Sequence, residues 1–341
     1  MIICRTPLRV SLFGGGTDFP DWYNSNNGLI ISGSINKYCY INVRKLPFMW
    51  DFNFRLRYHK TEEVKKVNQI KHGPYREIIK YLKLDQQKIE IIYTADLPAL
   101  SGLGASSSST VSAIHALSTF KGQYLSKKQI SQLAIYIEQE KLKENVGSQD
   151  QIATTFGGFN KISFKKDLDF TVEDFLNKEK VDELNRSSFL VYTGLQRKSD
   201  KIEKEKISNI KKNKLDRSLH KIMQITNEAF LEFNKKKINL KKIGMLLNKQ
   251  WEEKKKLSSK VSSPVINKIC KISSENGAYG TKLLGSGGGG FVLVICPPNK
   301  RKTIIKKLKK YKIVNFRFED TGSTIIYKKW LKKEKLLIKK I

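Results

Sequence analysis

The chain has few cysteines and no long apolar segment, and these absences restrict its class. Its 341 residues include four cysteines, none in a C-x-x-C pair, so neither a disulfide framework nor a zinc knuckle is expected. The longest clean apolar run, Phe291 to Cys296, is far too short to span a bilayer. Arg5, Pro7 and Arg9 interrupt the N-terminal segment, so no secretory signal core is expected. These features predict a cytoplasmic protein without a membrane span.

Acidic residues are scarce relative to basic ones. The chain has 32 Asp and Glu against 65 Lys and Arg, a formal net charge of +33. The lysines are spread along the chain, mostly between apolar residues at helical spacing, which is typical of a solvated surface. The excess could also attract an anionic substrate, and the sequence does not separate these two interpretations. A basic balance raises a nucleic-acid hypothesis, but no recognition motif is present, so no nucleic-acid partner is expected.

The hydrophobic fraction of 39% is normal for a globular chain, and the length suggests two domains. Residue patterns predict strands over 9–13, 29–43, 89–93, 159–164, 189–192, 291–295, 314–318 and 323–327. They predict helices over 62–82 with a break at Gly73-Pro74, and over 110–120, 126–143, 201–212, 215–235, 240–256, 264–276 and 300–311. We expect a domain change near the 189–192 strand, giving domains 1–186 and 187–341. The β-α-β-β ending predicts an α+β fold with an antiparallel sheet.

The sharpest motif is the segment from Pro98 to Ser109, PALSGLGASSSS. It follows a strand and leads into a helix. Glycines allow backbone N–H groups to approach an anion closely, and the following helix N-terminus adds its dipole. The alternative is a capped helix after a loop, since serine is a good N-cap. Four serines after Gly-Leu-Gly exceed what capping needs, which favours phosphate binding. No lysine follows in Walker A order.

Two further glycine clusters are present. Gly285 to Gly290, GSGGGG, formally satisfies G-x-G-x-x-G, but a strand follows it where a dinucleotide-binding fold needs a helix. Its four consecutive glycines indicate close approach, either of a ligand or of the first glycine loop; a glycine-rich β-turn is the alternative. Gly14 to Asp18, GGGTD, ends in polar groups suited to hydroxyls, although a hairpin turn would explain it equally well.

These motifs together resemble the GHMP kinase superfamily, which includes the galacto-, homoserine, mevalonate and phosphomevalonate kinases. The resemblance covers nearly the whole chain and is carried, in the family's order, by four segments: RVSLFGGGTD at 9–18, PALSGLGASSSS at 98–109, GSQDQ at 147–151 and KLLGSGGGGF at 282–291. Within the superfamily, Thr6 to Arg9 with the Gly-Gly-Gly-Thr-Asp cluster looks like the branch that phosphorylates D-glycero-D-manno-heptose 7-phosphate. A galactokinase would be expected to carry Gly-Glu-His-Thr-Asp instead.

The resemblance implies a two-domain GHMP kinase fold, in which an N-terminal domain like ribosomal S5 domain 2 packs on a ferredoxin-like C-terminal domain. It implies that ATP and Mg²⁺ take part. Asp150 aligns with the catalytic aspartate, and Arg9 with the basic partner that would keep it ionised. The ATP-binding residues that it implies are Pro98, Ser101, Gly102, Leu103, Gly104, Ala105, Ser106, Ser107, Gly287 and Gly288. Ala105 stands where many relatives have a serine.

The resemblance also implies a metal site and a substrate site. Glu138 matches the metal-binding glutamate in its spacing from Asp150, with Glu140 as the competing choice, and Ser106 matches the metal-binding serine. The substrate-binding residues that it implies are Gly16, Thr17, Asp18, Arg197 and Lys254. Arg197 is the best candidate for a substrate phosphate, whereas Lys254 lies in a Lys254-Lys255-Lys256 run that could equally be solvated.

The reaction implied is ATP-dependent phosphorylation of the anomeric hydroxyl of D-glycero-D-manno-heptose 7-phosphate, giving the 1,7-bisphosphate for nucleotide-activated heptose and surface polysaccharide. The alternative within the superfamily is a 1-kinase for fucose, galactose or a related free sugar. A nucleic-acid binder on a kinase scaffold would leave Asp150, Arg9 and both glycine loops unexplained. The sequence does not distinguish a monomer from a homodimer.

Overall fold

A pair of long antiparallel strands, β1 (Ile2–Phe13) and β2 (Gly28–Lys45), forms the frame of the molecule. The computed structural model describes residues 1–98, 101–196 and 200–329. Both strands are rich in β-branched and aromatic residues, which favour a pleated sheet. The first half of β2 pairs with β6 (Phe159–Phe164) and its second half with β5 (Ile89–Ala95). A single strand thereby joins two parts of one sheet.

The larger sheet has eight strands. Its path runs β12-β1-β2-β5-β3-β4, and β6 and β7 branch from β2. The added strands are β3 (Phe54–Arg57), β4 (Thr61–Val64), β7 (Phe170–Asp174) and β12 (Thr324–Lys328). β12 pairs antiparallel with β1, although it follows the second domain in the chain. The chain therefore returns to its first sheet at the end, so the continuous range 187–341 does not describe the second sheet alone.

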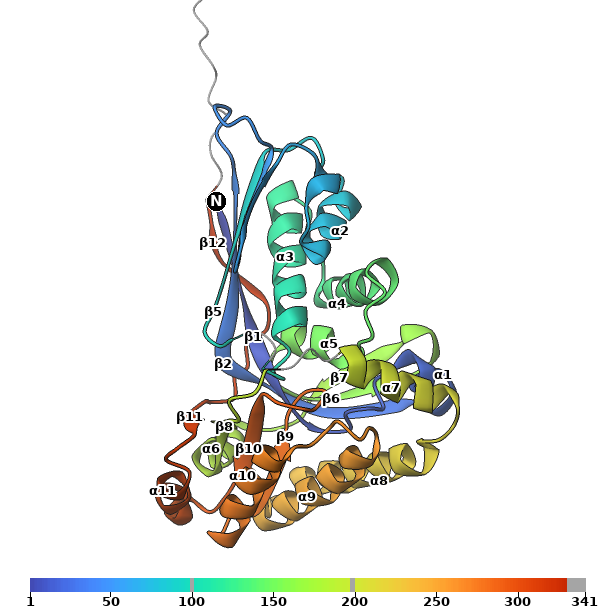
Figure 1. The fold of residues 1–341 in the computed structure, drawn as a ribbon, viewed down its shortest axis with the longest axis vertical. Helices are drawn as coiled ribbons and strands as arrows, with labels where there is room; N and C mark the ends of the chain where they lie inside the picture. The colour runs from blue at the N-terminus through green and yellow to red at the C-terminus, as the bar shows by residue number, and fades with distance from the viewer. Residues whose placement is uncertain (99–100, 197–199, 330–341) are drawn as a thin grey trace, which may run out of the picture.

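Helices cover one face of this sheet, as Figure 1 shows for α3 (Ala105–Lys121) with α2 (Gly73–Tyr81) and α4 (Lys127–Ile135) beyond it. α3 is buried along most of its length because β1 and β2 lie on one side and other helices on the other. α4 continues into a π-helical turn, Tyr136–Lys141, and such turns often mark functional sites. α1 (Pro20–Asn26), α5 (Gln149–Phe156) and α6 (Lys178–Ser187) complete this half.

The second domain is built on a four-stranded antiparallel sheet of order β11-β8-β10-β9. Its strands are β8 (Ser188–Tyr192), β9 (Gly280–Leu283), β10 (Phe291–Ile295) and β11 (Lys312–Val314). The helices of this half are α7 (Asp200–Lys211), α8 (Asp216–Asn234), α9 (Leu240–Lys256), α10 (Pro264–Glu275) and α11 (Pro298–Lys307). With α7–α10 between β8 and β9, the order is β-α-β-β-α-β, as in ferredoxin-like domains. This confirms the predicted fold class.

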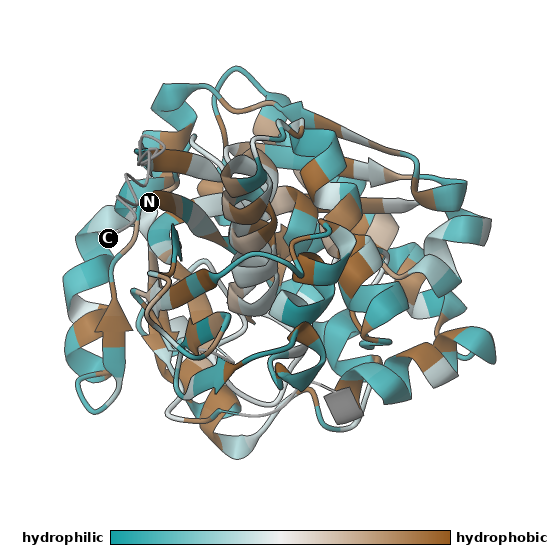
Figure 2. Ribbon diagram, turned by 90° about the horizontal axis from the view of Figure 1, so that it is seen from above, coloured by the Kyte–Doolittle hydropathy of each residue, from teal (hydrophilic) through white to brown (hydrophobic). Residues whose placement is uncertain are grey.

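One hydrophobic core joins the two domains. It contains Leu8, Val10 and Leu12 of β1 together with Leu293 of β10 and Phe233 of α8. Figure 2 shows hydrophobic segments inside the molecule and hydrophilic segments on its outer helices. The buried Lys282 of β9 adds a polar link, since its Nζ donates to the carbonyl oxygens of Ser11 at 3.1 Å and Leu12 at 2.6 Å. This core fixes the second domain against the strand that carries Arg9.

Two local predictions were wrong. Residues 62–72 do not form a helix: Thr61–Val64 is the edge strand β4, followed by a short 3-10 turn at Val67–Gln69. The carboxylate of Glu62 accepts the N–H groups of Lys71 and His72, which closes a loop instead of a helical turn. The strand predicted over 314–318 ends at Val314, and Phe318 makes an isolated bridge to Ile35. Within the described residues, no helix has the length and apolarity needed to span a membrane.

Candidate active site

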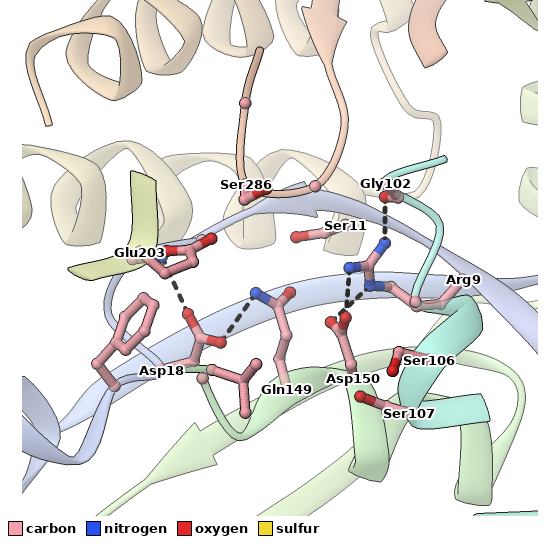
Figure 3. Close-up of a pocket in the computed structure, with 18 of the residues that line it drawn as sticks. Arg9, Ser11, Asp18, Gly102, Ser106, Ser107, Gln149, Asp150, Glu203 and Ser286 are labelled. Carbon is pink, nitrogen blue, oxygen red and sulfur yellow. Dashed lines mark hydrogen bonds and ion pairs between the residues drawn. The ribbon is translucent and has the colours of Figure 1, made fainter. Parts of the chain in front are cut away.

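A polar pocket lies where both glycine loops meet the strand β1 (Figure 3). Its walls come from the turn after β1, the N-termini of α3 and α5, helix α7 and the loop between β9 and β10. Both domains therefore contribute to it. The N-terminus of α3 lies at one end of the pocket and Asp18 at the opposite end.

The N-terminus of α3 presents backbone N–H groups to the pocket. Its N-cap, Gly104, has φ +73° and provides no side-chain cap for the helix. Ala105, Ser106 and Ser107 in the first turn line the pocket, and the first N–H groups of a helix have no partners within that helix. These donors and the helix dipole favour a phosphate. Because the backbone provides the donors, alanine at position 105 does not disturb this arrangement.

The two glycine loops touch at Gly102 and Gly285. A Cβ on Gly285 would lie 2.4 Å from the Cα of Gly102, and a Cβ on Gly102 would lie 2.6 Å from the carbonyl oxygen of Leu284. Both glycines have positive φ, +78° and +72°, which L side chains rarely adopt. Within the four-glycine run, a Cβ on Gly290 would lie 2.3 Å from the carbonyl oxygen of Ser101. Close contact with the first glycine loop, one of the two alternatives for that run, is therefore what the structure shows.

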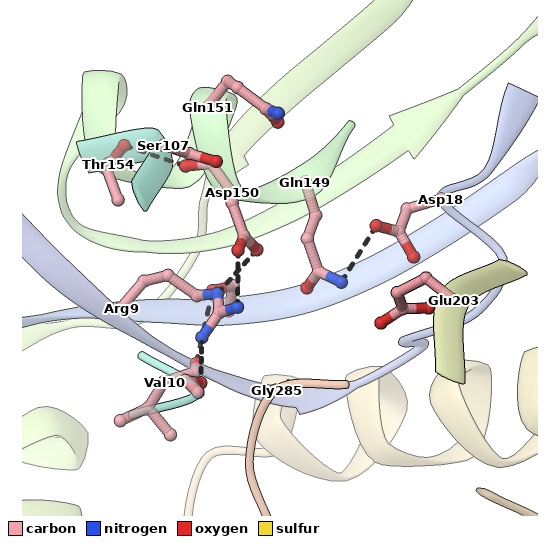
Figure 4. Close-up of polar contacts among 12 residues, drawn as sticks. Arg9, Val10, Asp18, Ser107, Gln149, Asp150, Gln151, Thr154, Glu203 and Gly285 are labelled. Atoms are coloured by element: carbon pink, nitrogen blue, oxygen red, sulfur yellow. Dashed lines mark hydrogen bonds and ion pairs between the residues drawn. The ribbon is translucent and has the colours of Figure 1, made fainter. Parts of the chain in front are cut away.

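Arg9 and Asp150 form the centre of the pocket (Figure 4). Arg9 donates from Nε to Oδ1 of Asp150 at 2.8 Å and from Nη2 to Oδ2 at 2.7 Å. Its Nη1 donates to the carbonyl oxygen of Gly102 at 2.7 Å, which ties the pair to the glycine loop before α3, here called the phosphate loop. The side chain of Arg9 is 4% exposed and that of Asp150 is 25% exposed. The carboxylate is thus held in a fixed orientation, yet a ligand in the pocket can reach it.

Asp18 lies at the other end of the pocket and is buried. The N–H of Gly16 donates to its Oδ1 at 3.0 Å, and Nε2 of Gln149 donates to its Oδ2 at 3.0 Å. Burial raises the pKa of Asp18; the Gly16 hydrogen bond opposes this, and the nearby Asp150 carboxylate adds to it. Gly147 passes so close that a Cβ there would lie 2.0 Å from Oδ2. The glycine before α5 therefore makes room for this carboxylate.

Glu138 lies in the π-helical turn beside the phosphate-binding end and is buried. Its Oε2 accepts hydrogen bonds from Ser107 at 2.9 Å and Gln151 at 2.5 Å. Among the described residues its Oε1 has no hydrogen-bond partner. Burial, with a contribution from the Glu144 carboxylate, raises the pKa of Glu138 to about 7. The competing Glu140 is exposed and pairs with Lys143.

This donor set fits Mg²⁺. The ion prefers carboxylate, hydroxyl and phosphate oxygens and usually keeps few protein ligands, and Glu138 offers an unpartnered buried oxygen beside Ser106 and Ser107. Residues 1–98, 101–196 and 200–329 contain no group of three His, Cys, Asp or Glu residues that could hold a metal alone. Glu138 and Ser106 could hold Mg²⁺ together with the oxygens of a bound phosphate.

Most of the predicted site residues line this pocket: Arg9, Gly16, Asp18, Ser101, Gly102, Gly104, Ala105, Ser106, Ser107, Glu138, Asp150, Lys254 and Gly287. In the described part of the chain, Pro98, Leu103, Thr17 and Gly288 do not line it. Arg197 lies outside the described residues.

Three of the four residues outside the lining make hydrogen bonds within the loops around the pocket. The hydroxyl of Thr17 donates to the carbonyl oxygens of Gly14 and Leu29, so it closes the turn. The carbonyl oxygen of Leu103 accepts the N–H of Arg9, and the N–H of Gly288 bonds Val261. These hydrogen bonds shape the loops around the pocket, and substrate binding by Thr17 and ATP contact by Pro98, Leu103 and Gly288 stay predictions.

Sequence reasoning missed part of the lining, notably Gln149, Glu203 and Lys206. Gln149 is adjacent to Asp150, so the α5 motif could have indicated it. Glu203 and Lys206 belong to a Lys- and Glu-rich helix whose pattern predicts a solvated surface.

Lys254 was predicted as a substrate-binding residue, but its Nζ donates to the backbone carbonyl oxygens of Leu283 and Gly285. Burial and the neighbouring Lys206 ammonium lower the pKa of Lys254 to about 7.

Comparison with known proteins agrees with this geometry. Residues 71–158 match the GHMP kinases N terminal domain, and residues 228–313 match the GHMP kinases C terminal domain. The chain is 30% identical to D-glycero-alpha-D-manno-heptose 7-phosphate kinase of Campylobacter jejuni, over 93% of this chain and 96% of that one. It is 25% identical to the galactokinase of Pyrococcus furiosus, over 89% and 91% of the two chains.

Comparison with solved structures shows the same fold. A crystal structure of a D-glycero-D-manno-heptose 1-phosphate kinase from Bacteroides thetaiotaomicron superposes with a TM-score of 0.79, at 24% identity, over 97% of this chain and all of that one. The chain belongs to the GHMP kinase family and has that family's two-domain fold. It is an ATP-dependent kinase, and the pocket described above is its candidate active site.

Proposed function

We propose that this kinase transfers the γ-phosphate of ATP to the anomeric hydroxyl of D-glycero-D-manno-heptose 7-phosphate. The observation that carries the proposal is the 30% identity to the Campylobacter jejuni heptose 7-phosphate kinase over nearly the whole of both chains. The buried carboxylate of Asp18 supports a polyhydroxylated acceptor, since carboxylates accept hydrogen bonds from hydroxyl groups. The 1,7-bisphosphate product would enter the synthesis of nucleotide-activated heptose for surface polysaccharide.

The proposed transfer uses the two ends of the pocket. The phosphates of ATP lie at the N-terminus of α3, and the sugar lies between Asp150 and Asp18. The anomeric oxygen forms a bond to the γ-phosphorus while the bond from that phosphorus to the bridging oxygen of ADP breaks. The hydroxyl proton passes to the Asp150 carboxylate, and ADP leaves with the electron pair. Glu138 and Ser106 would hold Mg²⁺, which would neutralise phosphate charge when bound.

Arg9 serves this transfer in two ways. Its two hydrogen bonds to Asp150 hold the carboxylate in one orientation, and positioning of this kind is a large part of phosphoryl-transfer catalysis. Its guanidinium charge lies beside the carbonyl oxygen of Gly102 in the phosphate loop, where negative charge on the transferring group would be stabilised. Loss of Arg9 would therefore affect both the orientation of the base and the stabilisation of charge.

A free sugar such as fucose or galactose is the second candidate. The charge balance at the Asp18 end favours it. There, among the described residues, Lys206 and Lys254 face the carboxylates of Glu203 and Asp18, which leaves no excess positive charge for a substrate phosphate. Arg197 is the remaining candidate for that phosphate. An Arg197→Ala variant that loses activity with a phosphosugar and keeps it with a free sugar would support the heptose phosphate.

The experiment is an assay of ATP consumption with Mg²⁺ and a panel of acceptors. The panel contains D-glycero-D-manno-heptose 7-phosphate, sedoheptulose 7-phosphate, mannose 6-phosphate, fucose and galactose. Turnover with the heptose 7-phosphate alone is the expected result, and an Asp150→Asn variant serves as the inactive control. Turnover with fucose or galactose and none with the heptose 7-phosphate would contradict the proposed substrate.

A further inference from the structure

Helix α7 brings two buried, oppositely charged side chains to the substrate end of the pocket. Glu203 is 7% exposed and Lys206 is 4% exposed, and both line the pocket. Their ion pair spans one turn of the helix, with Lys206 Nζ 3.2 Å from Glu203 Oε2. Lysine and glutamate are rarely buried to this degree unless they are paired or functional. This burial is not that of a solvated surface pair.

The contacts of Lys206 fix the position of this helix. Its Nζ donates to the carbonyl oxygen of Ser286 at 2.8 Å, in the loop that touches the phosphate loop. α7 also packs on α1 of the first domain (Figure 1). The ammonium group therefore ties α7 to the second glycine loop, and Glu203 is held at a fixed position inside the pocket.

Glu203 has accepting capacity that the protein does not use. A carboxylate can accept about four hydrogen bonds, whereas Glu203 Oε1 accepts one long hydrogen bond from Lys206, at 3.4 Å. Its Oε2 lies 3.2 Å from the same ammonium group in the ion pair and accepts no hydrogen bond among the described residues. A buried carboxylate left in this way carries a desolvation cost. Figure 3 shows it at the same end of the pocket as Asp18, away from Asp150.

A hydroxylated ligand matches this arrangement. The pKa of Glu203 is raised by burial, lowered by Lys206 and raised again by the charge of Asp18, which indicates two carboxylates in electrostatic contact. A phosphate there would be repelled by both carboxylates, and a metal cation would be repelled by the Lys206 and Lys254 ammonium groups. Hydroxyl groups donate to carboxylates and accept from ammonium groups, so they satisfy both.

We propose that Glu203 binds hydroxyl groups of the acceptor sugar together with Asp18, and that Lys206 is a positioning residue that holds Glu203 and α7 against Ser286. This inference rests on the proposed function, because it requires a sugar acceptor. With Glu203 in this role, α7 is the element that selects among sugars. Discrimination between epimers or deoxy sugars then depends on a helix remote in sequence from both the GGGTD and the GSQDQ segments.

The test is steady-state kinetics on the full chain with the acceptor that the wild type uses best and with its monodeoxy analogues. Glu203→Gln keeps the size of the side chain and removes its charge. We expect the KM for the sugar to rise about tenfold or more, as for loss of a charge-assisted hydrogen bond, with the KM for ATP unchanged. The wild type should reject at least one deoxy analogue by about tenfold or more, and Glu203→Gln should lose most of that discrimination.

Glu205→Gln is the matched control. Glu205 lies on the same helix and accepts a hydrogen bond from Ser258 at 2.9 Å, so its variant should keep wild-type kinetics. Should Glu203→Gln fail to fold, Glu203→Asp retracts the charge by one methylene and is expected to show the same rise in the sugar KM. Lys206→Met should raise the KM for the sugar, and Lys206→Arg should restore part of the loss.

Two results would overturn the inference. One is a Glu203→Gln variant with the sugar KM of the wild type. The other is unchanged discrimination against every deoxy analogue. Because the assay uses whichever sugar the wild type turns over, turnover of a free sugar in place of the heptose 7-phosphate would contradict the proposed substrate and would still test Glu203. Unchanged discrimination with the heptose 7-phosphate would contradict the role of Glu203 alone.

Discussion

Arg9 and Asp150 are joined by two hydrogen bonds of 2.8 and 2.7 Å although 141 residues separate them in the chain. The pair connects β1 to the first turn of α5, and a third hydrogen bond from Arg9 reaches the phosphate loop at Gly102. Three segments that the sequence separates thus meet at a single guanidinium group. Phosphoryl transfer depends on fixed positions and charges, and this junction provides both.

Replacement of Asp150 should abolish most of the activity. Asp150→Asn keeps the shape of the side chain but removes the proton acceptor, so we expect kcat to fall by about 10³-fold, within the range for general acid–base catalysis. Thermal unfolding should show a folded protein, and ATP binding should persist. Asp169→Asn, at an exposed surface pair with Lys128, is the control. A kcat within tenfold of the wild type in Asp150→Asn would contradict the assigned role.

The contact between the glycine loops should be intolerant of side chains. In Gly285→Ala the new Cβ would lie 2.4 Å from the Cα of Gly102, so the loops must separate. We expect a KM for ATP at least about tenfold higher and a lower Tm. Gly122→Ala is the control: its φ is also positive, +82°, but no described atom lies within 4 Å of the new Cβ.

The control variant separates strain from contact. Gly122→Ala should cost only the backbone strain of a left-handed residue, roughly 1–2 kcal/mol, and it should leave the KM for ATP unchanged. Equal KM values for ATP in Gly285→Ala and Gly122→Ala would show that contact between the loops does not shape the nucleotide site.

Glu138 should govern the dependence on Mg²⁺. Burial raises the pKa of Glu138 to about 7, so this carboxyl is largely protonated at pH 6 and ionised at pH 8. Metals bind the deprotonated ligand; less Mg²⁺ should therefore be needed for half-maximal activity at pH 8 than at pH 6. In Glu138→Gln the requirement should rise by about tenfold or more, and this pH dependence should be lost.

Glu140→Gln tests whether the choice between the two glutamates is correct. Glu140 lies two residues away, is exposed and pairs with Lys143. Its variant should keep the Mg²⁺ titration and the pH dependence of the wild type. A loss of Mg²⁺ affinity in Glu140→Gln, with none in Glu138→Gln, would assign the metal to the other side chain.

Stability should fall in mild acid, partly through His115. Burial lowers the pKa of His115 to about 4 from 6.5, and its Nδ1 lies 3.0 Å from Oγ of Ser323. The unfolded chain therefore takes up a proton first as the pH falls. This destabilisation is absent well above pH 6.5 and grows as the pH falls from 6.5 to 4, to about 3 kcal/mol.

The variant His115→Gln should flatten this part of the profile. Glutamine can keep a hydrogen bond to Ser323 but does not titrate, so the difference in unfolding free energy between pH 7 and pH 4.5 should shrink. Urea unfolding at several pH values measures it. A difference as large as that of the wild type would show that His115 does not contribute.

Local patterns predicted much of this fold. The strands Phe159–Phe164 and Phe291–Ile295 and the helix Leu240–Lys256 have the predicted bounds, because alternation, apolar runs and helical spacing reflect burial directly. The pairing of β12 with β1 was not predictable in this way. A short apolar strand near the end of a chain carries no local signal for the sheet that it joins.

The site residues also fall into those that the sequence indicates and those that it does not. The glycine loops, Arg9 and Asp150 carry signals in the sequence, since glycine runs and polar residues next to strands mark close approach and chemistry. Glu203 and Lys206 carry none, because a Lys- and Glu-rich helix resembles a solvated one. Their burial arises from the packing of α7 between α1 and the loop at Ser286, which only the tertiary structure determines.

The most direct test is ³¹P NMR of the products formed from ATP and D-glycero-D-manno-heptose 7-phosphate with Mg²⁺. We expect a new phosphate resonance coupled to the anomeric proton, equal in amount to the ADP formed, with the 7-phosphate resonance retained. Asp150→Asn should give neither signal at a comparable rate. ADP with inorganic phosphate and no sugar 1-phosphate, or a phosphate on another hydroxyl, would contradict the assignment of this pocket to anomeric phosphoryl transfer.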